Sequence, residues 1–186
     1  MLSSQKVSWH ARWTPPGLVL NLVKEKVETM KRTNFQEMVA ALLPAVEEIF
    51  PWDLQEELDS GKDILLLDVR CPLEFQAMHI RGSINVPRGV LELACDYGYE
   101  QTLPELVEAR ERRVVVVCRS GNRSVLAVHT MQLLGYRDVV SLKTGLRGWN
   151  DSEYPLVDME GNQVPLEYAD DYFLVRLRPE QVGPGA

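Results

Sequence analysis

The segment that follows residues 114–117 combines residue types that perform nucleophilic chemistry. Cys118 comes directly after four valines, and a helical pattern begins near Ser124. The N-terminus of a helix presents unpaired N–H groups and about half a positive charge, and Gly and Asn tolerate the left-handed backbone that turns N–H groups inward. The segment therefore predicts an anion-binding cup with a thiol at its base. Five residues separate the cysteine from the helix: Arg119, Ser120, Gly121, Asn122 and Arg123.

The same surroundings should ionise Cys118. A helix N-terminus and nearby cations lower the pKa of a cysteine thiol from about 8.5 to about 3.5–7.5. Arg119 and Arg123 supply such cations, and we expect both to point into the pocket. Cys118 is therefore predicted to be a thiolate, the form of cysteine that attacks electrophiles. The alternative is an inert cysteine packed at the end of a strand, which fits poorly with the two arginines and the glycine beside it.

Another polar motif begins at Asp68, directly after an apolar run of strand length. We expect Asp68 to support the cysteine loop, either by accepting hydrogen bonds from its N–H groups or by pairing with Arg123. Arg70 and Glu74 stand four residues apart, which is the spacing of a salt bridge on a helix. For Arg70, a structural role and a contact with substrate are both open.

Short apolar runs and helical stretches alternate along the middle of the chain, which predicts an α/β domain with a mainly parallel sheet. Ligand sites in such sheets gather at the carboxyl ends of the strands, where Asp68 and Cys118 both lie. The predicted strands are 64–67, 114–117 and 139–142, and the predicted helices are 73–78, 103–109 and 124–134.

Apolar residues recur at helical spacing from Phe35 to Ile49, and Pro44 should kink or split that helix. The helix either binds a partner or packs on its own domain. A capping signal formed by Asp53 and Glu56 predicts the start of a further short helix.

The composition limits the class of protein. The chain has 186 residues, a formal charge of −7 and three cysteines, and the acidic balance argues against general nucleic-acid binding. Cys71, Cys95 and Cys118 form neither an even disulfide framework nor the close pairs of a zinc site. We therefore expect free thiols, a cytoplasmic location, and no metal or cofactor. We see no signal peptide or membrane span, so no membrane partner is expected.

Three segments resemble the rhodanese homology domain: LLLDVRCPLEFQAMHIRGSINVP, VVVVCRSGNRS and LKTGLRGWNDSEYPL. The resemblance implies a five-stranded, mainly parallel sheet flanked by helices, and an activity of the thiosulfate sulfurtransferase type. Cys118 would take sulfane sulfur as a persulfide from a small anionic donor, thiosulfate or another persulfide. It would then pass the sulfur to a thiophilic acceptor such as cyanide or a protein thiol. The loop from Arg119 to Arg123 would cradle the persulfide and the donor.

The resemblance covers residues 51–157. It leaves an N-terminal arm and helical extension over residues 1–50 and a C-terminal extension over residues 158–186. Near and within the latter we expect a small hairpin at 157–164 and a loose tail at 179–186. The N-terminal helices either join two copies of the chain in a homodimer or cover the chain's own sheet.

Loop length separates two branches of this superfamily. Sulfurtransferases have six residues from the cysteine to the last loop position, whereas the related dual-specificity phosphatases have seven and usually a His before the cysteine. Here the loop from Cys118 to Arg123 has six residues, and Val117 precedes it, which favours sulfur. The alternatives are a cysteine phosphatase or arsenate reductase, and a non-catalytic binding or sulfur-relay module.

Some residues depart from the family's pattern. Met78 and Thr144 stand where family members often have glycine, and Thr144 is expected to alter the loop beside it. His79 is interpreted as a structural turn residue rather than a base. Cys71 is either a bystander or a resolving thiol that accepts sulfur from Cys118.

Overall fold

Five parallel strands form the centre of the structure, a computed structural model that describes residues 33–183. Their order across the sheet is β1-β5-β4-β2-β3, and every neighbouring pair runs parallel. The five-stranded α/β fold class expected from the resemblance is therefore confirmed. The strands are β1 (Glu48–Ile49), β2 (Ile64–Asp68), β3 (Ile84–Asn85), β4 (Arg113–Val117) and β5 (Asp138–Leu142).

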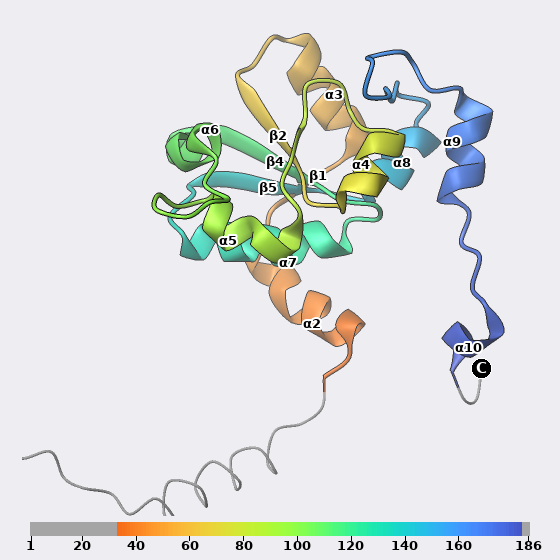
Figure 1. Cartoon of the computed structure of the whole chain (residues 1–186), viewed down its shortest axis with the longest axis horizontal. Coiled ribbons are helices and arrows are strands. Elements are labelled where there is room, and N and C mark those ends of the chain that lie inside the picture. Colours follow the sequence, from red (N-terminus) through yellow and green to blue (C-terminus); the bar gives the residue numbers. More distant parts are fainter. Residues whose placement is uncertain (1–32, 184–186) are drawn as a thin grey trace, which may run out of the picture. The chain divides into compact units, whose positions relative to one another are not determined.

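Helices cover both faces of this sheet (Figure 1). The helices are α2 (Phe35–Leu42), α3 (Pro51–Asp59), α4 (Pro72–Ala77), α5 (Leu91–Ala94), α6 (Pro104–Val107), α7 (Asn122–Leu133), α8 (Gly145–Asp151), α9 (Leu166–Phe173) and α10 (Pro179–Val182), and the 3₁₀ turns are η1 (Leu43–Ala45), η2 (Arg88–Val90) and η3 (Glu108–Glu111). α2, α5 and α7 pack on one face, whereas α3, α8 and α9 pack on the other. Within the part of the chain that the structure describes, no helix combines the length and the apolar character needed to cross a bilayer.

Alternate residues of the central strands enter two separate cores, which explains why these strands are apolar throughout. Val114 and Val116 of β4 belong to a first core with α7, whereas Val115 and Val117 belong to a second core with α8 and α9. Successive side chains of a strand point to opposite faces, and a parallel sheet covered on both faces buries both sets. The ends of β2 and β4 stay side by side, because the N–H of Val69 donates to the carbonyl oxygen of Val117 at 2.9 Å.

The N-terminal helical pattern is split at Pro44, as predicted, but it ends earlier than expected. α2 ends before Pro44, which lies in η1, because the proline ring cannot continue the α-helix. The prediction that the helix extends to Ile49 is wrong, since Ile49 lies in β1 and pairs with β5. α2 packs on α7 with Val39 in the first core, so it covers its own domain. Residues 1–32 of the predicted arm lie outside the described residues, and the homodimer through the N-terminal helices stays a prediction.

α3 begins at Pro51 and not at the capping signal predicted at Asp53. Phe50 is the extended N-cap residue, and the φ angle of proline suits the first turn of a helix. Asp53 lies within that first turn, where its negative charge is close to the positive end of the helix dipole.

The C-terminal part contains two helices that the sequence pattern does not predict. The hairpin expected at 157–164 is present as an antiparallel bridge. α9 follows and packs Ala169 and Phe173 into the second core. α10 forms within the range expected to be a loose tail, so that expectation is wrong for Pro179–Val182. This part of the chain therefore belongs to the same compact unit as the sheet.

Candidate active site

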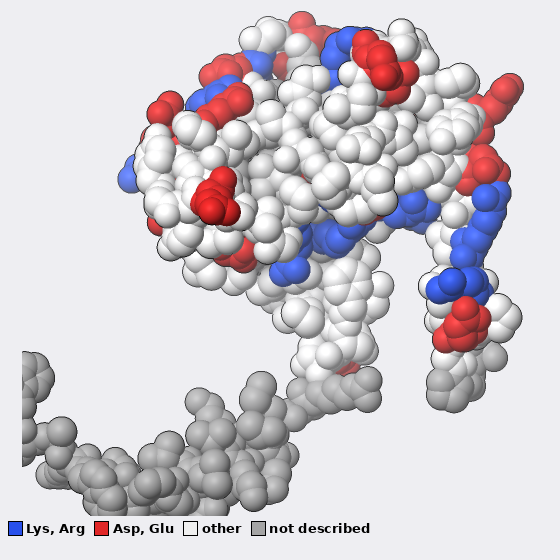
Figure 2. Space-filling view, in the orientation of Figure 1, with Lys and Arg blue, Asp and Glu red and all other residues white. Residues whose placement is uncertain are grey.

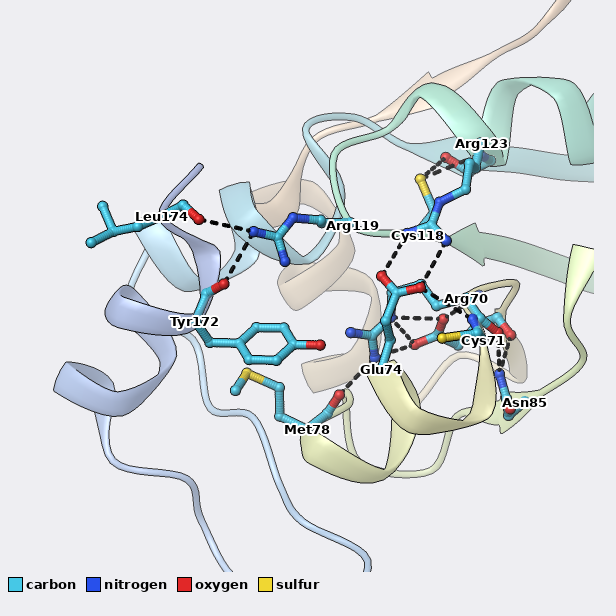
Figure 3. A network of polar contacts seen from close by, with 12 residues as sticks. Arg70, Cys71, Glu74, Met78, Asn85, Cys118, Arg119, Arg123, Tyr172 and Leu174 are labelled. Carbon is cyan, nitrogen blue, oxygen red and sulfur yellow. Dashed lines mark hydrogen bonds and ion pairs between the residues drawn. The ribbon is translucent and has the colours of Figure 1, made fainter. Parts of the chain in front are cut away.

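The cysteine loop joins the end of β4 to the start of α7, at the carboxyl edge of the sheet (Figure 3). α7 begins at Asn122, two residues before the predicted start at Ser124. Gly121 precedes the helix with a φ of 87°, the left-handed conformation predicted for this position. A Cβ at Gly121 would lie 3.0 Å from the backbone nitrogen of Thr144, so conformation and space both require glycine. Ser120 and Asn122 are partly buried on either side of it.

The N-terminus of α8 holds one side of the loop. The N–H of Leu146 donates to the carbonyl oxygen of Cys118 at 2.9 Å, and the N–H of Arg147 donates to that of Arg119 at 3.0 Å. The C=O and N–H groups of a trans peptide point in opposite directions. The N–H groups of Arg119 and Ser120 therefore face away from α8. The segment LKTGLRGWNDSEYPL, which contains the N-terminus of α8, thus sets the direction in which the amides of the cysteine loop point.

Gly145 permits this close approach, so Gly145→Ala should distort the loop. A Cβ at Gly145 would lie 2.4 Å from the carbonyl oxygen of Cys118 and 2.7 Å from the nitrogen of Ser120. The backbone would have to move, and the left-handed φ adds strain, so we expect the free energy of unfolding to fall by about 2–5 kcal/mol. Gly135→Ala is the matched control, because Gly135 also has a positive φ but has open space around its Cβ position. For the control we expect the free energy of unfolding to fall by only about 1–2 kcal/mol. Urea unfolding measures both variants, and equal losses of unfolding free energy would contradict the prediction.

The Cys118 thiol lies inside the loop, with none of its surface exposed. Its Sγ accepts a hydrogen bond from the N–H of Ser124 at 3.4 Å and contacts the Oγ of Ser124 at 3.4 Å. The structure therefore corrects the expected open cup. The amide that faces the sulfur belongs to Ser124 in the first turn of α7, and protein atoms cover the sulfur.

Two buried serines support the loop, and neither is among the residues predicted from the sequence. The Oγ of Ser124 donates to the carbonyl oxygen of Gly121 at 2.7 Å and contacts the Oγ of Ser141 at 2.8 Å. Ser141 belongs to β5, where it interrupts an apolar run. That interruption is the sequence signal that could have revealed it, because a buried hydroxyl needs a hydrogen-bond partner.

Arg123 pairs with Glu74 of α4 beside the thiol (Figure 3). Its two terminal nitrogens donate to the carboxylate at 2.8 and 2.7 Å. Burial raises the pKa of Glu74, but the hydrogen bonds and charge of Arg123, together with hydrogen bonds from Cys71, outweigh burial and lower that pKa to about 2. A carboxylate with a depressed pKa loses its charge only as the pH falls through that value, so the pair stays ionised near neutrality. The expected pairs Arg70–Glu74 and Asp68–Arg123 are both wrong.

Asp68 and Arg70 instead form an ion pair with each other, and their side chains are only 1% and 0% exposed. Nε of Arg70 donates to both carboxylate oxygens at 3.0 Å, and Nη2 donates to Oδ2 at 2.7 Å and to the carbonyl oxygen of Met78 at 2.6 Å. Arg70 precedes α4, which begins at Pro72, so the helical spacing rule does not apply to it. Asp68 thus binds Arg70, and not the cysteine loop as expected.

Arg119 extends away from the thiol and binds the C-terminal segment (Figure 3). Its Nη2 donates to the carbonyl oxygens of Tyr172 at 3.1 Å and Leu174 at 3.4 Å. The guanidinium also lies 5.3 Å from the ring centre of Phe173, within the range of a cation–π contact. The expectation that Arg119 points into the pocket is therefore corrected.

The structure also shows where His79, Thr144 and Cys71 lie. His79 is buried and stacks on Phe75 with ring centres 4.0 Å apart, which agrees with a structural turn residue. Thr144 caps α8 with a φ of 64°, a left-handed conformation that glycine adopts more readily. Cys71 is exposed at the N-cap of α4.

Residues 51–152, more than half of the chain, match the model of the rhodanese-like domain. The chain belongs to the rhodanese-like family. A solved structure from Rhodopseudomonas palustris, of a protein of unknown function described as a possible tyrosine phosphatase, has a TM-score of 0.62 and 28% identity. The match covers 68% of this chain and 98% of that one.

Curated relatives of this rhodanese-like chain are named for sulfur transfer. The adenylyltransferase and sulfurtransferase MOCS3 of Drosophila virilis is 32% identical over 159 residues, which are 83% of this chain and 34% of that protein. A sulfurtransferase of Allochromatium vinosum is 30% identical over 116 residues, which are 62% of this chain and 99% of that protein. The chain thus spans about a third of the first relative and nearly all of the second. Family and relatives together support sulfur transfer as the class of reaction.

Proposed function

We propose that this rhodanese-like chain is a sulfurtransferase that carries sulfane sulfur as a persulfide on Cys118. The observation that carries the proposal is the hydrogen bond from the N–H of Ser124, in the first turn of α7, to the sulfur of Cys118, which begins the six-residue loop that ends at Arg123. Amide donors that face a sulfur favour its anionic form and stabilise a terminal persulfide sulfur. The N–H groups of Arg119 and Ser120, which face away from α8, are further donors for the same purpose.

The reaction consists of two sulfur transfers. In the first, the Cys118 thiolate attacks the outer sulfur of thiosulfate, the bond between the two donor sulfurs breaks, and sulfite leaves with the electron pair. In the second, an acceptor thiolate attacks the outer sulfur of the persulfide, and the Cys118 thiolate leaves. Charge balances in each transfer, and neither consumes an external oxidant or reductant. A covalent intermediate of this kind predicts ping-pong kinetics.

The donor must first reach a covered sulfur, and the ion pair of Arg123 with Glu74 lies beside it. Because the pKa of Glu74 is about 2, protonation does not open this pair near neutral pH. An anionic donor opens it by competing with Glu74 for Arg123. Figure 2 shows Lys and Arg side chains along the lower edge of the domain, over α7 and toward the C-terminal segment, although the chain as a whole has a charge of −7. Such an edge attracts small anions.

The acceptor that we propose is a protein thiol or a protein sulfur carrier. A relative whose name joins adenylyltransferase to sulfurtransferase supports a relay between proteins. The three cysteines are free in the structure, which fits the reducing, cytoplasmic compartment in which such a relay would operate.

A non-catalytic binding or relay module is the second candidate. It is favoured by the complete burial of Cys118 and by the engagement of Arg119 with the C-terminal segment. For a binding module, a protein partner would bind equally well to the wild type and to Cys118→Ser, and neither form would transfer sulfur.

Mass spectrometry of the intact protein after incubation with thiosulfate tests the proposal. We expect one added sulfur atom, about 32 Da, which maps to Cys118 and is removed by cyanide. A second sample is incubated with glutathione persulfide as an alternative sulfur donor. If neither donor adds sulfur, hydrolysis of an aryl phosphate would point to a phosphatase, and its absence would favour the binding module.

A further inference from the structure

Arg70 has one nitrogen, Nη1, to which no residue from 33 to 183 offers an acceptor. Its Nη1 is buried and has no hydrogen-bond partner among the described residues, whereas Nε and Nη2 bind Asp68 and Met78. Burying an N–H of a charged group without an acceptor is unfavourable, so such groups are rare in native structures. A buried, unpaired guanidinium nitrogen beside a functional loop indicates a position that a ligand fills.

Arg70 lies at the same edge of the sheet as the thiol of Cys118. Asp68 is in register with Val117, and the N–H of Val69 donates to the carbonyl oxygen of Val117 at 2.9 Å. Cys118 therefore follows directly on the end of β4, and Arg70 lies two residues beyond the paired end of β2. A ligand that bound Nη1 would lie near the entrance to the cysteine loop.

Tyr172 of α9 supplies a second polar group. Figure 3 shows its hydroxyl end directed toward the guanidinium of Arg70. Burial raises the pKa of Tyr172, while the positive charges of Arg70 and Arg119 act in the opposite direction, which agrees that both guanidinium groups are close to the phenol. With a raised pKa the hydroxyl is protonated at neutral pH and is able to donate to an anion.

Contacts on both sides of Tyr172 hold it in this position. Arg119 of the cysteine loop binds the carbonyl oxygens of Tyr172 and Leu174, and the next side chain, Phe173, is buried in the second core. α9 lies beyond residues 51–152, which match the family model. The tyrosine is therefore contributed by the C-terminal extension of this chain.

We propose that Nη1 of Arg70 and the hydroxyl of Tyr172 form an anion subsite that receives the sulfonate oxygens of the sulfur donor. This inference rests on the proposed function and names the group that selects the donor. Arg70 is fully buried and Tyr172 only partly, so an anion that approaches from solvent meets the phenol hydroxyl before it reaches Nη1. Tyr172 is thus a specificity-determining residue that favours compact, strongly charged donors such as thiosulfate.

Tyr172→Phe tests the subsite, because it removes the hydroxyl and keeps the ring that contacts Arg119. Tyr168→Phe is the matched control, since Tyr168 lies on the same helix and is exposed. In steady-state sulfur transfer from thiosulfate we expect Tyr172→Phe to raise KM roughly tenfold and to change kcat less than about twofold, as for the loss of one hydrogen bond to a charged group. The control should leave both constants unchanged. Equal KM values in the two variants would overturn the subsite.

Thiosulfate binding to full-length Cys118→Ser, measured by calorimetry, separates the subsite from the proposed function. This variant has no thiol to load, so it reports binding alone. We expect the Kd for thiosulfate to rise roughly tenfold when Tyr172→Phe is added and to stay the same when Tyr168→Phe is added. That result would support the subsite even if the wild type accepted no sulfur. Undetectable binding, or equal binding in all three forms, would overturn it.

Discussion

Cys118→Ser should lower the rate of sulfur transfer from thiosulfate to cyanide by at least about a thousandfold. A serine hydroxyl stays protonated at neutral pH and cannot hold a persulfide, whereas it can still accept the N–H of Ser124 that now faces the sulfur. The loss should therefore reflect the chemistry and not the fold. Thiocyanate formation measures the rate, and a urea unfolding curve shows whether the free energy of unfolding is preserved.

Cys71→Ser is the matched control for this experiment. Cys71 is exposed at the N-cap of α4, a position that serine occupies well. We expect the variant to transfer sulfur within about twofold of the wild-type rate, as for other surface substitutions. A loss comparable to that of Cys118→Ser would make Cys71 a resolving thiol. Full activity of Cys118→Ser would exclude the persulfide mechanism.

Asp68→Ala should lower the free energy of unfolding by about 3–5 kcal/mol. The substitution leaves the guanidinium of Arg70 buried without its counter-ion, and a single buried charge is far more costly than the intact pair. The carbonyl oxygen of Met78 alone would remain as an acceptor for Nη2.

Asp63→Ala provides the comparison on the surface. Asp63 also binds an arginine through two hydrogen bonds, from Arg112 at 2.6 and 3.1 Å, but its side chain is 76% exposed. Water screens such a pair, so we expect a loss of about 0–1 kcal/mol. Unfolding in urea at neutral pH measures both variants. A similar small loss at both positions would show that the Asp68–Arg70 pair does not hold the corner between β2 and α4.

The central strands and the cysteine loop follow from local sequence patterns. The valines at 114–117 need burial on both faces wherever they lie, and the structure gives them a core on each side. Gly121 has the left-handed conformation predicted for it, because backbone preference is a property of the residue itself. The edge strands β1 and β3 have only two residues each, too few for a periodic pattern, and they were expected only through the resemblance to the family.

The partners of the charged side chains follow from the tertiary structure. A spacing of four residues pairs two side chains only if both lie on one helix, and α4 begins after Arg70. Arg70 therefore turns back to Asp68, and Glu74 is left for Arg123, which is 49 residues away in the sequence. No pattern of neighbouring residues in the sequence predicts the pairing of Glu74 with Arg123.

The sequence alone predicts candidate residues for the chemistry because burial periodicity and backbone preference act between near neighbours. Whether the sulfur is open or covered depends on segments that meet only in the folded chain. Arg119 binds the carbonyl oxygen of Tyr172, 53 residues further on, and α9 is held there by packing against the second core. The surroundings of the thiol are therefore decided by long-range packing, which residue spacing along the chain does not encode.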